Sequence, residues 1–307
     1  MNDIVLQTEA LTKYYGRDLA VDHLDMAIPR GCICGFLGRN GAGKTTAIKM
    51  MLGLLNPTMG SATVLGCDSR ELTPSIRQRV GYVTEGHHLY RWMSIGRLEK
   101  FQRAFFPRQW DGRLFNDMLE YFGLSKKQKI KHLSNGQRAQ VSLALTLAPN
   151  PELLIMDDPT LGLDAAIRRQ FLEGMIELIM REGRTILFSS HILADVERVA
   201  SRLVVIDKGV LRANCTLEQF RSAVKKVILA FEGPPPEGID IGGLIHCRRS
   251  ENELEVTLVG GDDKEIERWA NSAGAARYTI AKMTLEDQFI EYTAPANRKR
   301  LFKWEEI

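Results

Sequence analysis

The sequence predicts an α/β fold with a parallel-sheet core, followed by a small C-terminal α+β domain. Short apolar segments alternate with helical segments over residues 32–213, which is typical of parallel strands connected by helices. After about residue 222 the composition shifts, and a Pro-rich loop appears at Gly233–Gly238. We therefore expect one domain at 1–222, a second at 223–294 and a basic tail at 295–307.

The N-terminal part should begin with two antiparallel strands. Ile4–Ala10 forms the first strand, Val21 to Ile28 mark the second, and Pro29-Arg30-Gly31 is a turn. Cys32–Leu37 is an apolar strand, and Thr46–Leu54 is helical. Further strands of the core are expected at Ser61–Leu65, Val80–Thr84, Leu153–Asp157, Thr185–Ser189, Leu203–Asp207 and Gly209–Ala213.

Helices are expected between these strands. Residues 94–148 are mostly helical by the 3.6-residue spacing of Leu114, Met118, Leu119 and Phe122, and Ala165–Arg181 is a second helical region. In the C-terminal domain we expect strands at Lys226–Phe231, Leu254–Val259 and Arg277–Ala281, and helices at Lys264–Ala273 and Thr284–Tyr292.

Composition excludes several classes of function. The net charge is +3, from 41 basic and 38 acidic residues, which argues against a nucleic-acid binder. No segment approaches the 18 or more apolar residues of a membrane-spanning helix, and the acidic N-terminus lacks a secretion signal, so we expect a cytoplasmic protein. The five cysteines have no metal-like spacing and are predicted to be reduced thiols.

A phosphate-binding loop lies between the strand Cys32–Leu37 and the helix that follows it. Its residues fit G-x-x-x-x-G-K-[ST], whose glycines let successive backbone N–H groups face one concavity. A helix beginning at about Lys44 adds its N-terminal partial charge, Lys44 adds a full charge for the phosphates, and the Thr45 hydroxyl can bind Mg²⁺. The nine residues are Gly38, Arg39, Asn40, Gly41, Ala42, Gly43, Lys44, Thr45 and Thr46.

Three later segments end in polar groups suited to the same ligand. By itself Leu133–Gln137 is a helix-capping turn in which Ser134 could be the cap. Asp157 lies at the carboxyl end of a buried strand, where open α/β sheets bind ligands. Asp158 to Asp164 follow at once, and His191 ends the next apolar strand.

In order and spacing, these segments resemble the ATP-binding-cassette (ABC) ATPases over nearly the whole chain. Leu133–Gln137 resembles the signature LSGGQ, Leu153–Asp157 the Walker B strand, Leu161–Asp164 the D-loop and His191 the switch histidine. Tyr15 matches the aromatic residue that stacks on adenine, and Glu85 lies where the family usually has the Q-loop glutamine. Met283–Phe289 resembles the accessory domain on ATPase subunits of ABC-2 exporters.

The resemblance implies a P-loop NTPase cassette with an N-terminal antiparallel β subdomain and a helical signature subdomain. It also implies ATP and Mg²⁺ as ligands and a second ABC subunit, as a homodimer, packed head to tail. The phosphate loop of one chain and the signature of the other would hold each nucleotide. The signature residues are Ser134, Asn135, Gly136 and Gln137.

The family pattern assigns roles to the remaining residues. Lys44 neutralises the phosphates, and Thr45 and Asp157 hold Mg²⁺, with Glu85 as a further ligand. Asp158 and His191 act on the attacking water, and Asp164 organises the facing site. The alternatives of a capping or core histidine for His191, and of a core aromatic for Tyr15, stay open at this point.

Two residues depart from the family pattern. Asp158 stands where glutamate is usual, so its carboxylate reaches one methylene less, and a misplacement of about 1 Å can cost around a hundredfold in rate. We hypothesise slow turnover and a long-lived closed dimer. Glu85 adds negative charge beside the phosphates, which would weaken nucleotide binding, retune coupling or have no effect. Asn135, in place of a signature glycine, is expected to matter less.

The leading hypothesis is the energising subunit of an export-type transporter. It would work with a separate transmembrane permease, peripherally on the cytoplasmic face of the cell membrane and without nucleic acid. The alternatives are a soluble regulatory or mechanical ATPase, and a poorly hydrolysing cassette paired with an active one. His87, His88, Trp92 and Met93 are expected on a surface that touches the permease.

Overall fold

The computed structural model describes residues 3–180, 183–238 and 241–294, and its contacts divide the chain into two units after Leu211. The sequence predicted a boundary after residue 222. The helix α8 (Leu217–Ala223) lies in the second unit, where the Phe220 ring packs edge-on against Tyr292 at 5.4 Å between centroids. The predicted basic tail at 295–307 and residue Arg181 lie outside the described residues.

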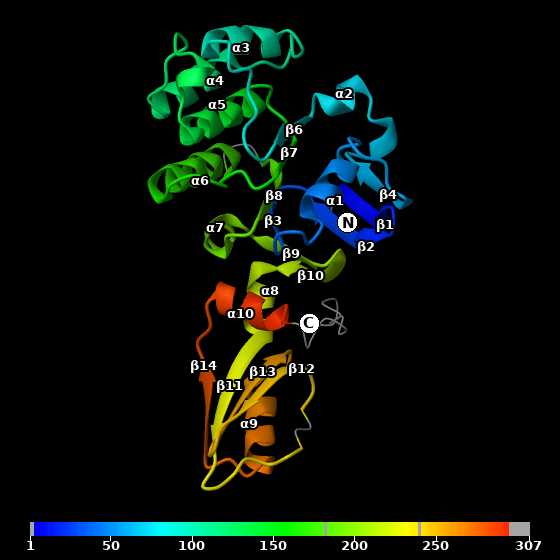
Figure 1. Cartoon of the computed structure of the whole chain (residues 1–307), viewed down its shortest axis with the longest axis vertical. Helices are drawn as coiled ribbons and strands as arrows, with labels where there is room; N and C mark the ends of the chain where they lie inside the picture. Colours follow the sequence, from blue (N-terminus) through cyan, green and yellow to red (C-terminus); the bar gives the residue numbers. More distant parts are fainter. Residues whose placement is uncertain (1–2, 181–182, 239–240, 295–307) are drawn as a thin grey trace. The chain divides into compact units, whose positions relative to one another are not determined.

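A ten-stranded sheet forms the framework of the first unit, and its strand β10 continues past the unit boundary at Leu211 (Figure 1). Its order is β5-β4-β1-β2-β10-β9-β3-β8-β7-β6. The strands are β1 (Ile4–Tyr15), β2 (Asp18–Pro29), β3 (Ile33–Leu37), β4 (Met59–Val64), β5 (Cys67–Asp68), β6 (Val80–Val83), β7 (Leu153–Met156), β8 (Thr185–Ser190), β9 (Arg202–Asp207) and β10 (Val210–Thr216).

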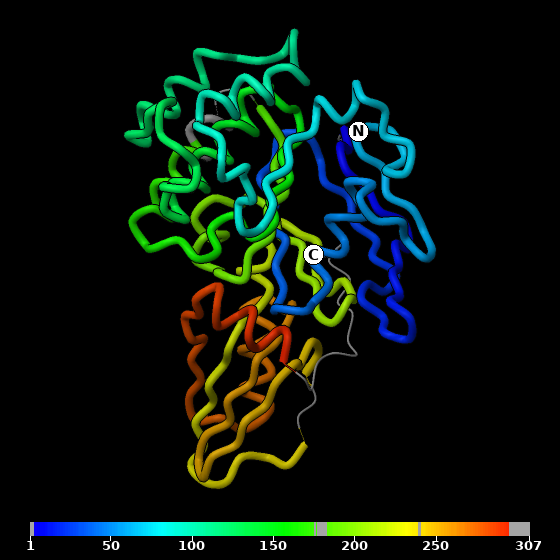
Figure 2. Tube along the Cα trace, turned by 45° about the horizontal axis from the view of Figure 1, so that its top comes forward, coloured from blue at the N-terminus to red at the C-terminus, as the bar shows by residue number. Residues whose placement is uncertain are grey.

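The sheet is antiparallel at one end and parallel at the other. Strand β1 pairs antiparallel with β2 and β4, and both views place these strands side by side (Figure 2). Strands β9, β3, β8, β7 and β6 pair in parallel. The sequence predicted both parts; the structure adds that β10 joins them through a parallel bridge between Val210 and Asp22.

The parallel strands are apolar because both of their faces are covered. Every residue of β3, β7 and β8 is buried. Their register pairs Leu37 with Ser190 and Met156 with Phe188, and β6 ends beside β7 with Val83 opposite Met156. The segments that follow all four strands therefore leave the sheet at the same edge, which is where a ligand site forms in such folds.

The helices of the first unit fall into two groups. Three helices between β6 and β7 gather apart from the antiparallel strands and form the predicted helical segment (Figure 2): α3 (Ile95–Arg103), α4 (Gly112–Tyr121) and α5 (Asn135–Leu147). Phe115, Met118 and Leu119 of α4 are buried. The others are α1 (Lys44–Met51), α2 (Pro74–Arg77), α6 (Ala165–Met180) and α7 (Leu193–Val199).

The second unit contains a four-stranded antiparallel sheet in the order β12-β13-β11-β14. The strands are β11 (Val224–Ala230), β12 (Leu244–Arg249), β13 (Glu253–Val259) and β14 (Arg277–Ala281), with the helices α9 (Asp263–Ser272) and α10 (Leu285–Tyr292). Apolar residues of α9 pack with the sheet around Val227, Leu254 and Ile266. The sequence missed β12, whose last residues are exposed and basic. No helix in the described part of the chain is long and apolar enough to cross a membrane.

Candidate functional site

A cavity of about 330 Å³ opens at the carboxyl edge of the parallel strands. It collects residues from the loop after β3, from α1 and from the segments after β6, β7 and β8. Most of the residues predicted for the phosphate site therefore come together. The lining is Ala20, Asn40, Gly41, Ala42, Gly43, Lys44, Thr45, Thr46, Glu85, Asp158, Leu161 and His191.

The phosphate loop is shaped by Gly43, the residue before α1. Its φ of 102° lies in the left-handed region, and an added Cβ would lie 2.4 Å from the carbonyl oxygen of Ala20. No other residue type fits both conditions. Helix α1 begins at Lys44, as predicted, so its free N–H groups face the cavity.

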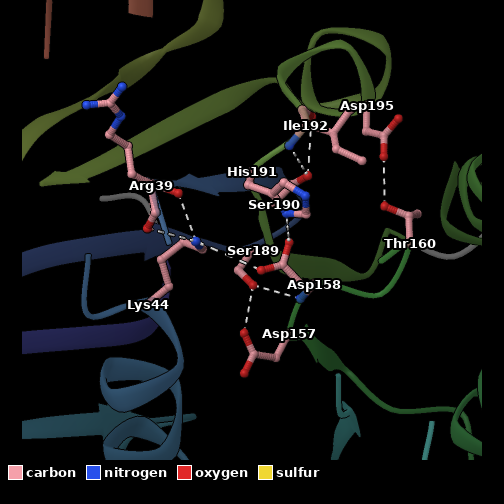
Figure 3. A network of polar contacts seen from close by, with 11 residues as sticks. Arg39, Lys44, Asp157, Asp158, Thr160, Ser189, Ser190, His191, Ile192 and Asp195 are labelled. Atoms are coloured by element: carbon pink, nitrogen blue, oxygen red, sulfur yellow. Dashed lines mark hydrogen bonds and ion pairs between the residues drawn. The ribbon is translucent and has the colours of Figure 1, made fainter. Parts of the chain in front are cut away.

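The Lys44 ammonium lies at the floor of this cavity and is 5% exposed. It donates to the carbonyl oxygens of Gly38 (2.8 Å) and Arg39 (3.4 Å), and lies 3.9 Å from Oδ2 of Asp158 (Figure 3). Burial lowers the pKa of Lys44, while the charges of Asp158, Asp157 and Glu85 raise it. The loop thus fixes a cation whose positive charge lacks water and attracts an anion.

Ser189 holds the Asp157 carboxylate and the backbone N–H of Asp158 in place (Figure 3). Its hydroxyl donates to Oδ1 of Asp157 (2.8 Å) and accepts from the backbone N–H of Asp158 (2.8 Å). Asp158 adopts φ 42°, a left-handed conformation that aspartate tolerates better than most residues. Sequence reasoning missed this role of Ser189, for which the Ser-Ser pair before His191 was the available signal.

His191 lies next to the second carboxylate. Its Nδ1 is 2.9 Å from Oδ1 of Asp158, and its side chain is 32% exposed (Figure 3). Because an ionised carboxylate only accepts hydrogen bonds, Nδ1–H donates to Asp158 and Nε2 is left for a ligand. The ring lines the cavity rather than the core, and its partner is a carboxylate rather than a helix end.

Glu85 lines the cavity and is exposed, two residues after β6. Negative charge accumulates here: burial, together with Asp157 and Glu85, raises the pKa of Tyr82 to about 12. Within the described residues no group of three His, Cys, Asp or Glu side chains could hold a metal ion. The Thr45 hydroxyl and the carboxylates of Asp157 and Glu85 still suit Mg²⁺, which commonly takes one or two protein ligands and completes its shell with phosphates and water.

The signature residues do not line the cavity that the structure describes. Ser134 caps α5 in a capping box, accepting from Gln137 N–H (3.1 Å) while the Gln137 side chain accepts from Ser134 N–H (3.0 Å). Ser134 and Asn135 are exposed, and an added Cβ on Gly136 would lie 2.7 Å from Cγ2 of Ile167. The capping role is therefore present, and the exposed cap leaves its outer face free for a ligand.

Gly38, Arg39 and Asp157 are also absent from the lining of the cavity, and so are the predicted residues Asp164 and Tyr15. Asp164 caps α6, accepting from the N–H groups of Ala166 (3.1 Å) and Ile167 (2.9 Å). Tyr15 ends β1 and is 50% exposed, with the Lys13 ammonium 5.6 Å from its ring centroid. A core position for Tyr15 is thus wrong, and the ring is free to stack on a base.

The loop after Glu85 differs from the prediction of a surface segment. His88 is exposed and Trp92 is 66% exposed, but His87 is 4% exposed and Met93 is 9% exposed. The prediction was wrong for His87 and Met93. Met93 is held by backbone bonds to Tyr90 and Ile130, and the His87 ring contacts the segment after β7.

An apolar groove of about 550 Å³ lies beside this loop, and we call it the aromatic groove. Tyr90 packs edge-on against Phe101 (5.8 Å between centroids), which packs against Phe105 (5.3 Å). Exposed aromatic clusters of this kind mark sites of protein contact. Its lining is Pro74, Arg77, Gln78, His88, Leu89, Tyr90, Leu98, Phe101, Gln102, Phe105 and Phe106.

Comparison with known proteins agrees with the geometry of the cavity. A family model described as "ABC transporter" matches residues 21–161. The chain is 31% identical to the Nod factor export ATP-binding protein I of Burkholderia thailandensis, covering 93% of this chain and 95% of the relative. It is 29% identical to the uncharacterized ABC transporter ATP-binding protein YdbJ of Bacillus subtilis, covering 95% and 96%.

The fold is also found among solved structures. One described as the structure of the ATP binding subunit of an ABC transporter superposes with a TM-score of 0.64 and 27% identity, covering 71% of this chain and 92% of that chain.

Replacing Ser189 tests whether its two hydrogen bonds, to the Asp157 carboxylate and from the Asp158 N–H, stabilise the fold. Ser189→Ala leaves Asp157 and the Asp158 N–H without this partner, so the free energy of unfolding should fall by about 1–3 kcal/mol in urea titrations. Ser190→Ala is the matched control, because the Ser190 hydroxyl bonds the backbone of Ile192 within its own turn. An equal loss of unfolding free energy in both variants would contradict this role of Ser189.

Proposed function

Because the chain belongs to the ATP-binding subunits of ABC export transporters, we propose that two copies clamp two ATP molecules head to tail and thereby drive a separate membrane permease. The protein is an ABC ATPase, so the proposal concerns how its residues divide the work. Closure would follow ATP binding, and opening would follow loss of the γ-phosphate contacts.

The observation that supports a pair of chains is that the two parts of the predicted nucleotide site lie apart within one chain. One chain brings Lys44, Asp158 and His191 to the cavity, while Ser134 and Asn135 lie exposed at the N-terminus of α5, outside the described lining. A helix N-terminus with a hydroxyl binds phosphate oxygens well. A second chain that presents this end to the cavity would complete the site.

Within the cavity each residue has a distinct task. The loop N–H groups and Lys44 would hold the phosphates, and Thr45 and Glu85 would hold Mg²⁺. Asp157 is buried and does not line the cavity, so it would reach Mg²⁺ through water. Bound Mg²⁺ would neutralise the charge that develops on the phosphate oxygens. His191 would donate from Nε2 to the γ-phosphate while Nδ1–H stays on Asp158.

Asp158 would orient the attacking water, and its short side chain would make turnover slow. The carboxylate is drawn toward His191 and Lys44, at 2.9 and 3.9 Å. A glutamate would extend about one carbon–carbon bond further into the cavity. The same feature favours a second candidate, a poorly hydrolysing cassette that pairs with a more active one.

Glu85 would tune the affinity for nucleotide. Its charge raises the pKa of Lys44 and so favours the charged ammonium, but the same charge also repels the phosphates. The two effects oppose each other, and we propose that retuning of the coupling is the net result.

The permease would dock in the aromatic groove, on the cytoplasmic face of the membrane. The groove is apolar, and Tyr90 and Phe105 are 52% and 58% exposed. Its edge residues His88 to Tyr90 follow Glu85 closely in the chain. A helix of the permease that displaces this loop would therefore act on the cavity.

The dimer is tested with Asp158→Asn, which should keep ATP bound. With Mg-ATP this variant should sediment as a dimer. Adding Asn135→Glu should restore the monomer, because the new carboxylate would face the partner's γ-phosphate. A carboxylate at the start of α5 does not harm the helix itself. A monomer at high concentration for Asp158→Asn alone, both by itself and beside its permease, would overturn the proposal.

Restoring the reach of the carboxylate tests the slow-turnover hypothesis. Asp158→Glu should raise the single-turnover rate of ATP hydrolysis by about tenfold or more, because displacements of about 1 Å change rates by around a hundredfold. Rapid-quench measurements at saturating Mg-ATP read this rate directly. An unchanged or lower rate would count against the reach argument.

The docking site is tested with Phe105→Glu. This charge should abolish co-purification with the permease, and the ATPase activity of the isolated chain should stay within about twofold. Leu54→Glu is the control, since Leu54 is 57% exposed and lies outside the groove lining. Equal retention of the membrane protein by both variants would contradict the assignment.

A further inference from the structure

His87 occupies a position that a surface loop does not explain. Its ring is 4% exposed, while the adjacent His88 is exposed and lines the aromatic groove. Nε2 of His87 lies 3.0 Å from the carbonyl oxygen of Pro159. This bond connects the segment after β6 with the segment after β7, across 72 residues of sequence.

The backbone turns sharply to bring the ring to this place. The His87 N–H donates to the carbonyl of Thr84 (3.3 Å), and Gly86 and His87 have φ of 77° and 47°. A left-handed conformation at a non-glycine residue costs on the order of 1–3 kcal/mol and persists where the surroundings enforce it. The turn sends Glu85 to the cavity, His87 inward and His88 to the groove.

The chemistry of the ring makes it a fixed donor. A carbonyl oxygen only accepts, so Nε2 carries the proton. Nδ1 is buried without a hydrogen-bond partner in the described part of the chain. Burial lowers the pKa of His87, the bond to the Pro159 carbonyl raises it, and the nearby Arg138 and His88 lower it. A neutral ring with its proton on Nε2 is the form that satisfies the carbonyl.

Besides the bond between His191 and the Asp158 side chain, three side-chain hydrogen bonds tie residues 158–160 to other segments. The Asp158 N–H donates to Ser189 (2.8 Å), the Pro159 carbonyl accepts from His87, and the Thr160 hydroxyl donates to Asp195 (2.8 Å). Of these three, the His87 bond is the one that comes from the loop between cavity and groove. Because the proline ring fixes φ, only ψ of Pro159 can take up a shift of its carbonyl, and the rest of the shift turns the peptide that joins Pro159 to Asp158.

We propose that His87 is a positioning residue, whose bond to the Pro159 carbonyl sets the orientation of Asp158 and links it to the loop bordering the aromatic groove. The proposal rests on the function proposed above, in which Asp158 orients water and a permease occupies the groove. A partner that shifts residues 88–90 would then also shift His87, and with it the segment that contains Asp158.

Two variants of equal backbone strain separate positioning from packing. His87→Gln keeps an N–H donor at a similar reach, whereas His87→Leu fills the space without a donor. His87→Leu should lower kcat of the isolated chain about ten- to hundredfold with KM unchanged, and His87→Gln should stay within about threefold. His23→Gln is the control, because His23 is exposed, has the same left-handed backbone (φ 44°) and lies outside the lining of both the cavity and the groove. Equal losses in both His87 variants, or full activity of His87→Leu, would overturn the proposal.

Hydrogen exchange gives a second readout that needs no hydrolysis. His87→Leu should speed amide exchange at Asp158, Thr160 and Leu161, and His87→Gln should not. Unchanged exchange in His87→Leu would overturn the positioning role, even in a chain that hydrolyses no ATP. Faster exchange together with absent hydrolysis in the wild type would support the positioning role and count against the proposed function alone.

Discussion

The buried ammonium of Lys44 is the constraint on which the site depends. It is held by two carbonyl oxygens of its own loop and faces a carboxylate at 3.9 Å, so its charge is oriented but not fully neutralised. The sheet register makes this possible, because it brings the ends of β3, β7 and β8 to one edge. An anion with several negative oxygens can neutralise the Lys44 charge, which water would solvate if the side chain were exposed.

The carboxylates around that ammonium are oriented by residues at the end of β8, the strand next to β3 in the sheet. Ser189 bonds to both Asp157 and Asp158, and His191 bonds to the Asp158 side chain. One strand end therefore orients the polar groups that follow its neighbour. Such an arrangement resists small displacements, which is what a site needs when misplacement of about 1 Å changes rates by around a hundredfold.

The N-terminus of α5 lies outside the lining of the cavity, and the proposed mechanism starts from this separation. The N-terminus of α5 is capped by its own Ser134 and is exposed. In the proposed dimer it would contact a phosphate that is bound in the cavity of the second chain. The aromatic groove is likewise exposed and apolar. We infer that a second subunit and a permease would cover these two surfaces, and the loop from Glu85 to Tyr90 runs between the cavity and the groove.

The sequence by itself determined most of the strands and helices and the phosphate loop, because hydrophobic periodicity and glycine spacing act locally, but it missed β12, α7 and α8. It also indicated Asp158 and His191, which follow apolar strands directly. Only the tertiary structure decided that His87 is buried against Pro159, that Ser189 connects the Asp157 carboxylate to the Asp158 N–H, and that Ser134 closes a capping box outside the cavity. Those outcomes depend on which strands become neighbours and on how a turn points its side chains, and neither is written in the local pattern of residues.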